Sequence, residues 1–222
     1  MNADIPRFSP PADSRPHDSA WPQMRWPSPP GTELAGGSVR LTGFASDDAA
    51  GLFGALDDKR VWEHLAERPG SAAALALKLM GHASDERITW VVRLSSPLGD
   101  LPAGSVVGTS SYLEVSRSDS RLEIGSTAYA PSVWGTQVNP QTKLLLLAHA
   151  FDDLGAGRVQ LKTDVRNTRS QQAIARLGAT YEGTLRRYQR RADGSVRDTV
   201  LFSITAEEWP EVRRRLEERL AA

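Results

Sequence analysis

The stretch of sequence that decides the fold is Trp134-Gly135-Thr136-Gln137-Val138-Asn139-Pro140, which leads into the apolar segment 143–151. It is typical of a glycine loop that opens onto a helix, because Asn139 suits the N-cap and Pro140 the first helical position. The strand-like segment 122–129 comes just before it. A helix start leaves backbone N–H groups unpaired and carries partial positive charge, so it can bind an anion. Strand, loop and helix together indicate a site for a phosphorylated cofactor, although many such turns bind nothing.

The composition narrows the class of protein without deciding its function. The 222 residues include 27 basic and 27 acidic side chains, so no global charge draws the chain to nucleic acid or to a membrane. The sequence has no cysteine, which excludes disulfides and a cysteine nucleophile, and its four histidines show no metal-ligand spacing. No apolar run approaches the ~20 residues of a membrane span, and the amino terminus lacks the pattern of a secretion signal. We therefore expect a soluble cytoplasmic protein without a metal site.

The composition of the chain changes at about residue 36. Residues 1–36 contain eight of the fourteen prolines and show no periodic pattern, so we expect a poorly ordered extension. Trp21 and Trp26 are exceptions within it, because they can clip this arm onto the domain or onto a neighbouring subunit. Regular structure is expected to begin at Ser38, and residues 37–222 are expected to form one domain.

From Ser38 onward the hydrophobic pattern alternates between strands and helices. Thr168-Arg169-Ser170-Gln171 matches a capping box, and Asp193-Gly194 is a strong hairpin signal. Helical periodicity predicts helices over 47–56, 72–82, 140–154, 168–177 and 206–220, with Pro210 as a break near the start of the last. Period-two alternation and apolar runs predict strands near 39–44, 88–94, 105–114, 122–129, 159–165, 180–190 and 196–204.

Six short motifs occur in a characteristic order within about residues 38–215. They are Glu123-Ile124-Gly125, Trp134-Gly135-Thr136, Asn167-Thr168-Arg169-Ser170, Ile174-Ala175-Arg176-Leu177-Gly178-Ala179, Glu182-Gly183-Thr184-Leu185-Arg186 and Arg197-Asp198-Thr199-Val200. With the order of strands and helices, they resemble the GNAT superfamily of N-acetyltransferases, in particular the ribosomal-protein-alanine N-acetyltransferase-like branch (RimJ/RimL type). The resemblance implies an α/β (α+β) GNAT fold. Its central sheet would be mixed and mostly antiparallel, with about seven strands, four to five flanking helices and a splay after the fourth strand.

The resemblance also implies acetyl-coenzyme A as the donor. The pantetheine arm would lie in the V-shaped gap along Ala128, Tyr129 and Ala130, added in effect as one more strand. Asn167 stands where the family places an asparagine that contacts the cofactor, and Ser170 lies one turn further on, within reach of the sulfur. The pyrophosphate would meet backbone N–H groups at the helix start. The residues implied there are Trp134, Gly135, Thr136, Gln137, Val138 and Asn139.

Two positions depart from the family pattern. The usual phosphate loop has a second glycine where this chain has Gln137. Many members carry a tyrosine in the last helix that protonates the departing thiolate, and Ile174 holds that position here. Ser170 is therefore the candidate acid, with Tyr188 as the second choice.

Acetyl transfer to an amine needs few further groups. A backbone N–H of the splayed strand would polarise the thioester carbonyl. The attacking amine must be neutral, and an α-amino group with a pKa of about 7.7–8.0 is helped by a base. Glu123 is the candidate base, because some members place a catalytic glutamate at this strand position. It can equally orient backbone or pair with an arginine.

The sequence leaves the acceptor open. Trp62, Tyr188 and Gln189 are the candidate acceptor-site residues. Trp90 and Tyr112 can also line the pocket, although Trp90 lies in an apolar strand and suits the core better. Three interpretations remain: acetylation of a protein amino terminus, acetylation of a small amine, and binding of coenzyme A without catalysis. A homodimer is common for the fold, and the terminal hairpin offers an edge for pairing.

Overall fold

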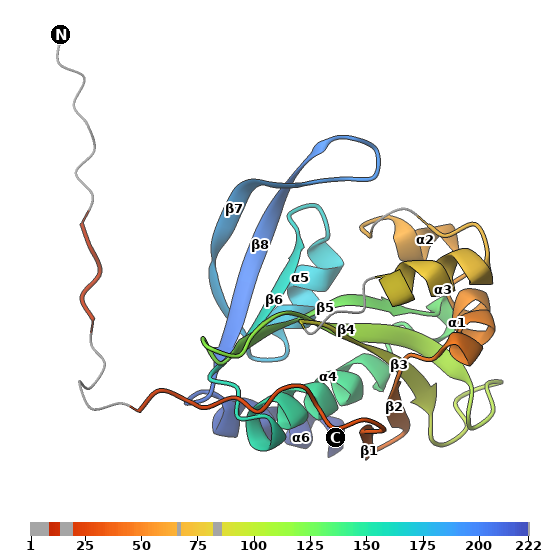
Figure 1. Ribbon diagram of the computed structural model, residues 1–222, viewed down its shortest axis with the longest axis horizontal. Coiled ribbons are helices and arrows are strands. Elements are labelled where there is room, and N and C mark those ends of the chain that lie inside the picture. The colour runs from red at the N-terminus through yellow and green to blue at the C-terminus, as the bar shows by residue number, and fades with distance from the viewer. Residues whose placement is uncertain (1–8, 14–19, 66–67, 82–85, 222) are drawn as a thin grey trace, which may run out of the picture.

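A mixed sheet of eight strands organises the part of the chain that the structure describes, which comprises residues 9–13, 20–65, 68–81 and 86–221 (Figure 1). In this computed structural model the strands follow the order β1-β2-β3-β4-β5-β6-β8-β7. Neighbouring strands are antiparallel, except that β5 and β6 are parallel. The predicted mixed, mostly antiparallel sheet is confirmed, with one strand more than expected. The strands are β1 (Glu33–Gly36), β2 (Val39–Gly43), β3 (Ile88–Leu94), β4 (Val106–Ser116), β5 (Arg121–Tyr129), β6 (Arg158–Asp164), β7 (Thr180–Arg190) and β8 (Val196–Thr205).

The sheet splays open between β5 and β6. These strands pair only along their first three residues, as far as Glu123 opposite Gln160. Beyond Glu123, β5 stays paired with β4, whereas β6 pairs with β8. The register of β4 and β5 shifts next to Ser126, whose φ is 46°. A bulge of this kind bends the strand and increases its twist. The predicted splay after the fourth expected strand is therefore confirmed.

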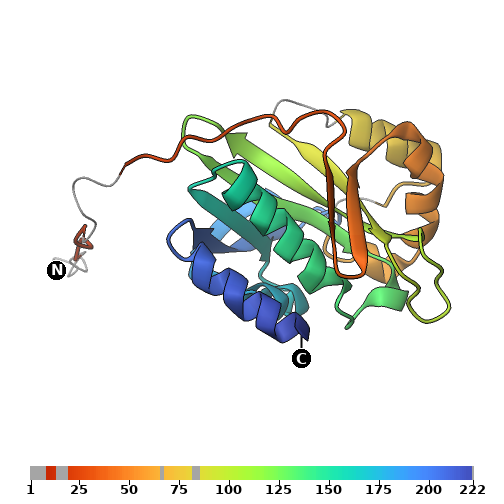
Figure 2. The same cartoon turned by 90° about the horizontal axis from the view of Figure 1, so that it is seen from below.

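Helices cover both sides of the sheet. α4 (Val138–Ala148), continued by a π-helical turn (His149–Asp153), lies beside α6 (Trp209–Ala221) on one face (Figure 2). α1 (Ala49–Ala55), α2 (Lys59–Trp62) and α3 (Ala72–Gly81) stand on the other side, around a small core of their own (Figure 1). α5 (Thr168–Ala175) follows β6. Among the described residues, no helix is both long and apolar enough to cross a membrane.

β6 shows why one face of the sheet is apolar and the other polar. Val159 and Leu161 are buried in the main core, which α4 and α6 complete, so Lys162 and Asp164 point to the opposite side. The period-two pattern is confirmed up to Asp164, where the strand ends, and Val165 is exposed instead of extending the apolar side. We call the side opposite α4 and α6 the polar face.

The expectation that regular structure begins at Ser38 is wrong, because the proline-rich arm supplies β1. This strand pairs with β2 through a two-residue turn in which Gly37 has a φ of 59°. Glycine adopts such a conformation without strain, and Gly-Gly-Ser is a suitable hairpin sequence. Only Leu34 of the four strand residues is buried, so the strand leaves no alternating pattern in the sequence.

The arm upstream of β1 is also fixed to the domain, as its tryptophans suggested. Met24 is buried in the main core, and Trp26 packs edge-on against Tyr112 with ring centroids 6.2 Å apart. Ser28 Oγ lies 2.8 Å from Nε2 of His149, at the end of α4. Through these contacts residues 24–28 lie against the domain. The domain boundary at residue 36 stays a prediction.

α4 begins at Val138, two residues before the predicted first helical position. The side chain that hydrogen-bonds to the first turn is that of Thr136, not that of the predicted N-cap residue Asn139. The Thr136 Oγ1 accepts the Val138 N–H at 3.3 Å, and the hydroxyl donates to the Val133 carbonyl at 2.7 Å. Pro140 is the third helical residue, where the N–H has no intrahelical partner in any case. The proline is therefore tolerated inside the first turn.

Two other helix starts differ from the prediction. The N-cap of α5 is Asn167, not Thr168, since the Asn167 Oδ1 accepts the Ser170 N–H at 3.0 Å. Asparagine is a favoured N-cap because its side chain satisfies one of the unpaired donors. α6 begins at Trp209, three residues later than predicted, so Pro210 lies in the first turn and does not break the helix.

Candidate functional site

The open edge of β5 presents a backbone N–H to the gap between β5 and β6. The Ala130 N–H donates to the Val107 carbonyl of β4 at 2.8 Å. Because successive residues of a strand point to opposite edges, the Tyr129 N–H faces the gap. The Tyr129 carbonyl faces the same way and accepts a hydrogen bond from Trp134 Nε1 at 2.9 Å. Trp134 therefore ties this edge to the loop that precedes α4.

The loop before α4 keeps its backbone accessible. Gly135 has a φ of 77°, and a Cβ placed on it would meet no atom within 4 Å. Gln137 stands where a second glycine is usual, but its φ of −73° suits any residue. Its Oε1 accepts a hydrogen bond from Gln141 Nε2 at 3.3 Å, so the side chain lies along α4 and away from the loop. The residues present therefore fit a pyrophosphate at the helix start.

Two guanidinium groups stack on Trp134. Arg169 of α5 lies 4.2 Å from the ring centroid, and Arg60 of α2 lies 5.4 Å from it. Such contacts contribute about 0.5–1 kcal/mol at exposed sites. They bring positive charge to the loop from helices on either side of the splay. Sequence reasoning did not single out either arginine, because this stacking depends on three segments distant in the chain.

Glu123 is buried at the base of the splay, with 6% of its surface exposed. Its partner is Lys162, whose Nζ lies 2.8 Å from Glu123 Oε2, 2.7 Å from Glu114 Oε1 and 3.0 Å from the Tyr188 hydroxyl. Burial raises the pKa of Glu123, and Lys162 opposes this rise. Burial would lower the pKa of Lys162, but the neighbouring Glu114 and Glu123 carboxylates hold it above its ordinary value. We call these four residues the carboxylate cluster.

Gly125 makes room for the buried carboxylate. A Cβ on Gly125 would lie 2.5 Å from Glu123 Oε1 and 2.8 Å from a methyl carbon of Leu113. Both distances are shorter than Cβ atoms tolerate. The Glu123-Ile124-Gly125 motif thus has a physical reason, since the glycine leaves space for the glutamate two residues before it.

We expect Gly125→Ala to displace the Glu123 carboxylate. For the base role that the resemblance implies, this should lower kcat for acetyl transfer by about 100-fold, because a shift of ~1 Å in a reacting group can cost that much. Gly54→Ala is the matched control, since a Cβ on Gly54 meets no atom within 4 Å. Steady-state kinetics of the two variants and the parent protein, with one acceptor, make the comparison. A Gly125→Ala variant with the parental kcat would show that the position of Glu123 is unimportant.

Lys143 is a buried lysine of α4 that sequence reasoning missed. Its Nζ donates to Thr127 Oγ1 at 2.6 Å and to Ser110 Oγ at 3.1 Å, and these hydroxyls lie 2.8 Å apart. Burial lowers the pKa of Lys143 to about 7, against the attraction of the Glu123 carboxylate. Ser110 and Thr127 belong to β4 and β5 next to the bulge at Ser126. Lys143 therefore clamps the two strands where β5 bends away from β6.

The start of α5 brings Asn167 and Ser170 together. The Asn167 side chain is engaged in capping through the Ser170 N–H. The Ser170 side chain is half-buried, and its hydroxyl forms no hydrogen bond with a described residue. Ile174 is buried in the main core. The roles of Asn167 and Ser170 toward the cofactor stay predictions.

The candidate acceptor residues lie in different places. Tyr188 belongs to the carboxylate cluster through Lys162, and Gln189 is the partner of Arg197 in the β7–β8 ladder. Trp62 packs against the small core of α1–α3, and its Nε1 donates to a backbone carbonyl of that unit at 2.9 Å. The structure thus brings Tyr188 to Lys162, the partner of Glu123, and Trp62 shows no contact with the cluster among the described residues.

Tyr112 does not line a pocket. It is fully buried between the sheet and α4, and its hydroxyl donates to the Leu146 carbonyl at 2.7 Å. Tyr112 lies on the core side of β4, which explains why its aromatic ring cannot face an acceptor. Trp90 packs edge-on against it with ring centroids 5.9 Å apart, so the core role expected for Trp90 is confirmed.

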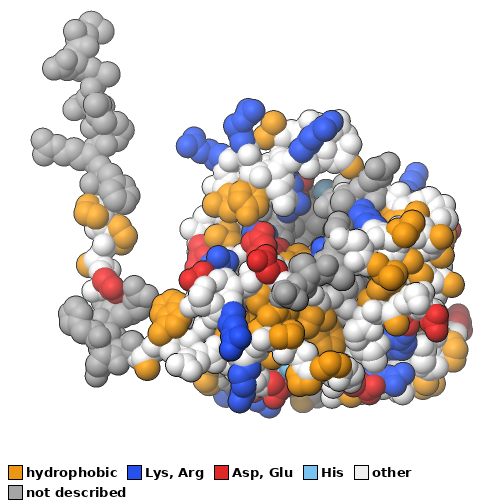
Figure 3. Space-filling view, in the orientation of Figure 1, with side chains coloured by type: hydrophobic (Ala, Val, Ile, Leu, Met, Phe, Trp, Pro, Cys, Tyr) orange, Lys and Arg blue, Asp and Glu red, His pale blue; other side chains and the backbone are white. Residues whose placement is uncertain are grey.

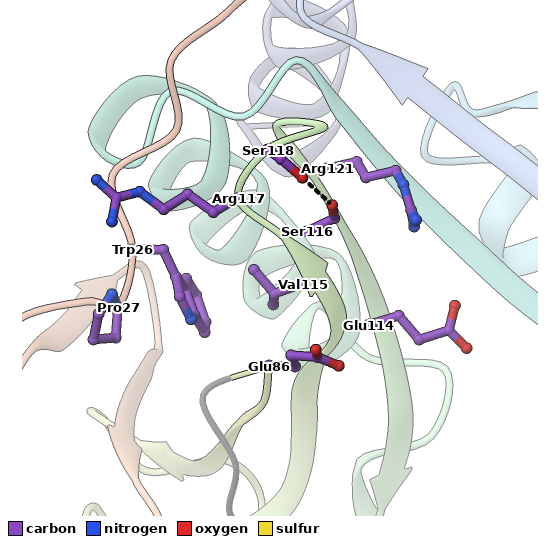
Figure 4. Close-up of a pocket in the computed structure, with 9 residues that line it drawn as sticks. All are labelled: Trp26, Pro27, Glu86, Glu114, Val115, Ser116, Arg117, Ser118 and Arg121. Atoms are coloured by element: carbon purple, nitrogen blue, oxygen red, sulfur yellow. Dashed lines mark hydrogen bonds between the residues drawn. The ribbon is translucent and has the colours of Figure 1, made fainter.

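Two cavities lie away from the splay. The larger, of about 740 Å³, is between the arm and the turn that joins β4 to β5 (Figure 4). It shares only Glu114 with the carboxylate cluster, and that side chain points away from Trp26 in the figure. The other, of about 410 Å³, lies beside His149 and the arm. Neither is lined by Tyr129 or Gly135, so the strand edge and the loop define the candidate site.

Comparison with known proteins agrees with this geometry. The family model described as an acetyltransferase (GNAT) domain matches residues 38–180. An acetyltransferase structure from T. thermophilus is 36% identical, covers 88% of this chain and 100% of that chain, and has a TM-score of 0.74. RimJ of Mycobacterium smegmatis, solved with CoA-disulfide, is 24% identical over 85% of this chain and 95% of that chain, with a TM-score of 0.72. At this identity the likeness to RimJ shows the fold alone.

A curated relative, the N-acetyltransferase p20 of Bacillus licheniformis, is 28% identical over 104 residues. The match covers 47% of this chain and 57% of that protein, so the chain spans little more than half of the relative's length. The family match, by contrast, covers well over half of this chain. The chain belongs to the GNAT acetyltransferases.

Proposed function

We propose that this protein transfers the acetyl group of acetyl-CoA to a primary amine, by direct attack of the amine on the thioester. The observation that carries the proposal is the open edge of β5, where the Tyr129 N–H faces a gap that closes at the buried Glu123. An exposed strand edge can pair with the amide groups of a pantetheine arm. The accessible loop around Gly135 supports pyrophosphate binding beside this edge.

Bound acetyl-CoA supplies a thioester whose carbonyl carbon is open to attack by the amine. A backbone N–H at the open edge of β5 polarises that carbonyl. Arg60 and Arg169, stacked on Trp134, add positive charge near the phosphates. The residues proposed to hold the cofactor are Ala128, Tyr129, Ala130, Trp134, Gly135, Thr136, Gln137, Val138, Asn139, Asn167 and Ser170.

Glu123 takes the proton of the incoming amine, directly or through a water molecule. Its raised pKa suits this role, since a base works best with a pKa near the working pH. Ser170 is the proposed donor of a proton to the departing thiolate. Tyr188 is the second choice, because its hydroxyl accepts a hydrogen bond from Lys162 and keeps its own proton for donation.

The proposed acceptor is a protein amino terminus or a small amine. β7 is exposed along most of its length, which supports the edge pairing of a homodimer. Binding of coenzyme A without catalysis is the alternative, and Ile174 in place of a tyrosine favours it.

Calorimetric titration with acetyl-CoA tests the cofactor site. We expect saturable binding by the parent protein and its loss in Gly135→Trp, where the indole would fill the space beside the loop. Gly31→Trp is the matched control, because Gly31 also has a positive φ, of 76°, and open space around it. A thiol-release assay with a panel of amines follows. Failure of the parent protein to bind would sink the proposal, and binding without turnover on any amine would favour the alternative.

A further inference from the structure

Three buried polar atoms on the polar face have no hydrogen-bond partner among the described residues. They are Glu123 Oε2, Arg197 Nε and Thr199 Oγ1. Lys162 Nζ lies 2.8 Å from Glu123 Oε2, but this ion pair lacks the angle of a hydrogen bond. Buried polar groups are hydrogen-bonded in the great majority of cases. Three exceptions on one face therefore indicate a place for a polar ligand.

The strand register brings these atoms to the same side of the sheet. Val200 of β8 is buried in the main core, so its neighbour Thr199 points to the polar face, and Arg197 shares that direction two residues earlier. Glu123 reaches the polar face through its ion pair with Lys162. The hairpin of β7 and β8 borders a hollow in the surface and carries arginine side chains at its outer end (Figure 3).

Arg197 is a cation without an ion-pair partner among the described carboxylates. Asp164, which lies opposite Thr199 in the β6–β8 ladder, is already occupied. Arg191 donates to both of its oxygens, at 2.6 and 2.8 Å, and the Arg166 N–H donates at 2.9 Å. Burial lowers the pKa of Arg197, and the charges of Asp164 and Glu123 oppose this shift. A half-buried guanidinium without a hydrogen-bond partner for its Nε is stabilised by an anionic partner.

We propose that Arg197 and Thr199 bind a carboxylate of the acceptor, while the amine of the same molecule meets Glu123. The acceptors of this enzyme are then amino acids or other small aminocarboxylates. This inference rests on the proposed function and narrows its substrate. The guanidinium and the hydroxyl donate to the carboxylate oxygens, and Glu123 accepts from the amine. Gln189, opposite Arg197 in the ladder, flanks the carboxylate end.

The charge of Arg197 decides between a free carboxylate and the neutral carbonyl that follows a protein amino terminus. Hydrogen bonds between ionised partners are about twice as strong as neutral ones, and a guanidinium fork matches the planar carboxylate. We therefore expect the parent enzyme to prefer alanine over alaninamide by about 10-fold in kcat/KM, after correction for the fraction of neutral amine. A preference for alaninamide would overturn the inference.

Variants of the two residues test the subsite with alanine and isopropylamine as acceptors. Arg197→Met should lower kcat/KM for alanine by about 10- to 100-fold and Thr199→Val by about 2- to 10-fold, as expected for a charged and a neutral hydrogen bond. Neither should change kcat/KM for isopropylamine more than about twofold. Arg190→Met is the control, because Arg190 is exposed on the same hairpin and carries the same charge. Equal losses for both acceptors would contradict the inference.

Thr199→Val keeps the test decisive even where Arg197→Met fails to fold, because it removes a hydroxyl that has no partner to lose. A binding experiment separates the inference from the proposed function. The ¹⁵N signal of Arg197 Nε is followed while alanine, and then isopropylamine, is added without acetyl-CoA. A saturable shift with alanine alone supports the subsite even if no amine is acetylated. Turnover of amines without such a shift overturns the subsite and leaves the proposed function standing.

Discussion

Replacing Glu123 with glutamine is expected to lower kcat for amine acetylation by about 10²- to 10⁴-fold, the usual contribution of a general base. The amide keeps the shape of the side chain and the space beside Gly125, but it cannot accept the proton of the amine. Lys162 retains Glu114 and the Tyr188 hydroxyl as partners, so the fold should survive the change. Steady-state kinetics and a thermal unfolding curve of the same sample separate loss of chemistry from loss of structure.

Glu114→Gln is the matched control for this variant. Glu114 contacts the same lysine but is about half exposed, so its loss should reduce kcat by less than 10-fold. Burial raises the pKa of Glu123, and the charge of Glu114 adds to this rise. The kcat/KM of the parent enzyme should therefore fall as the pH drops through the pKa of Glu123, which lies above the ordinary glutamate value. Glu114→Gln should shift this fall in kcat/KM to lower pH, and Glu123→Gln should abolish it. Comparable losses in the two variants would show that Glu123 acts only as one charge among several.

Replacing Lys143 with methionine is expected to stabilise the protein at neutral pH while impairing it as an enzyme. Lys143 is 5% exposed, and burial lowers its pKa to about 7. An apolar side chain of similar length removes this desolvation cost, and exchanges of buried charges for apolar residues can stabilise by about 1–4 kcal/mol. Ser110 and Thr127 keep each other as partners at 2.8 Å. Loss of the clamp should let the β5 bulge shift and reduce kcat by about 100-fold.

The stabilisation expected from Lys143→Met depends on pH, and the direction of this dependence follows from the pKa of Lys143. The pKa of Lys143 is about 7 in the folded protein and ~10.4 in an unfolded chain, so the unfolded chain binds more protons between these values. The contribution of Lys143 to stability therefore improves as pH rises through this window, and its penalty is complete below pH 7. The gain from Lys143→Met should be largest at pH 6.5 and small at pH 9.5, measured by urea unfolding. A variant less stable than the parent at both pH values would show that the hydrogen bonds of Lys143 outweigh its desolvation.

The strands and helices that position the site could be predicted from the sequence, because each has a periodic pattern of its own. β3 spans the predicted range 88–94, and the Asp193-Gly194 signal marks the turn between β7 and β8, where Gly194 has a φ of 83°. The loop at Gly135 could also be predicted, because its glycine and the helix start that follows it are neighbours in the sequence. Helix starts were less predictable, because Thr136 and Asn167 compete with their neighbours for the same capping role.

The parts of the site that escaped prediction depend on contacts between distant segments. Lys143 has the sequence position of an ordinary polar residue at the edge of an apolar helix, and its partners Ser110 and Thr127 lie 33 and 16 residues away. Lys162 is, in the sequence, one of several polar residues in an alternating strand. Its role becomes visible only when β6 places it between two carboxylates. Arg197 is, in the sequence, only part of a family motif, and the absence of a partner for its Nε among the described residues is a property of the folded chain.

β1 limits how far this protein can be shortened. A version that starts at residue 37 would turn β2 into the outermost strand, and the backbone donors and acceptors that now pair along 33–36 would face solvent. Such unprotected strand edges are templates for pairing with other chains and lead to aggregation. Shortening would also remove Met24 and expose the core side chains that it covers. The end of the proline-rich segment thus keeps the outer edge of β2 paired.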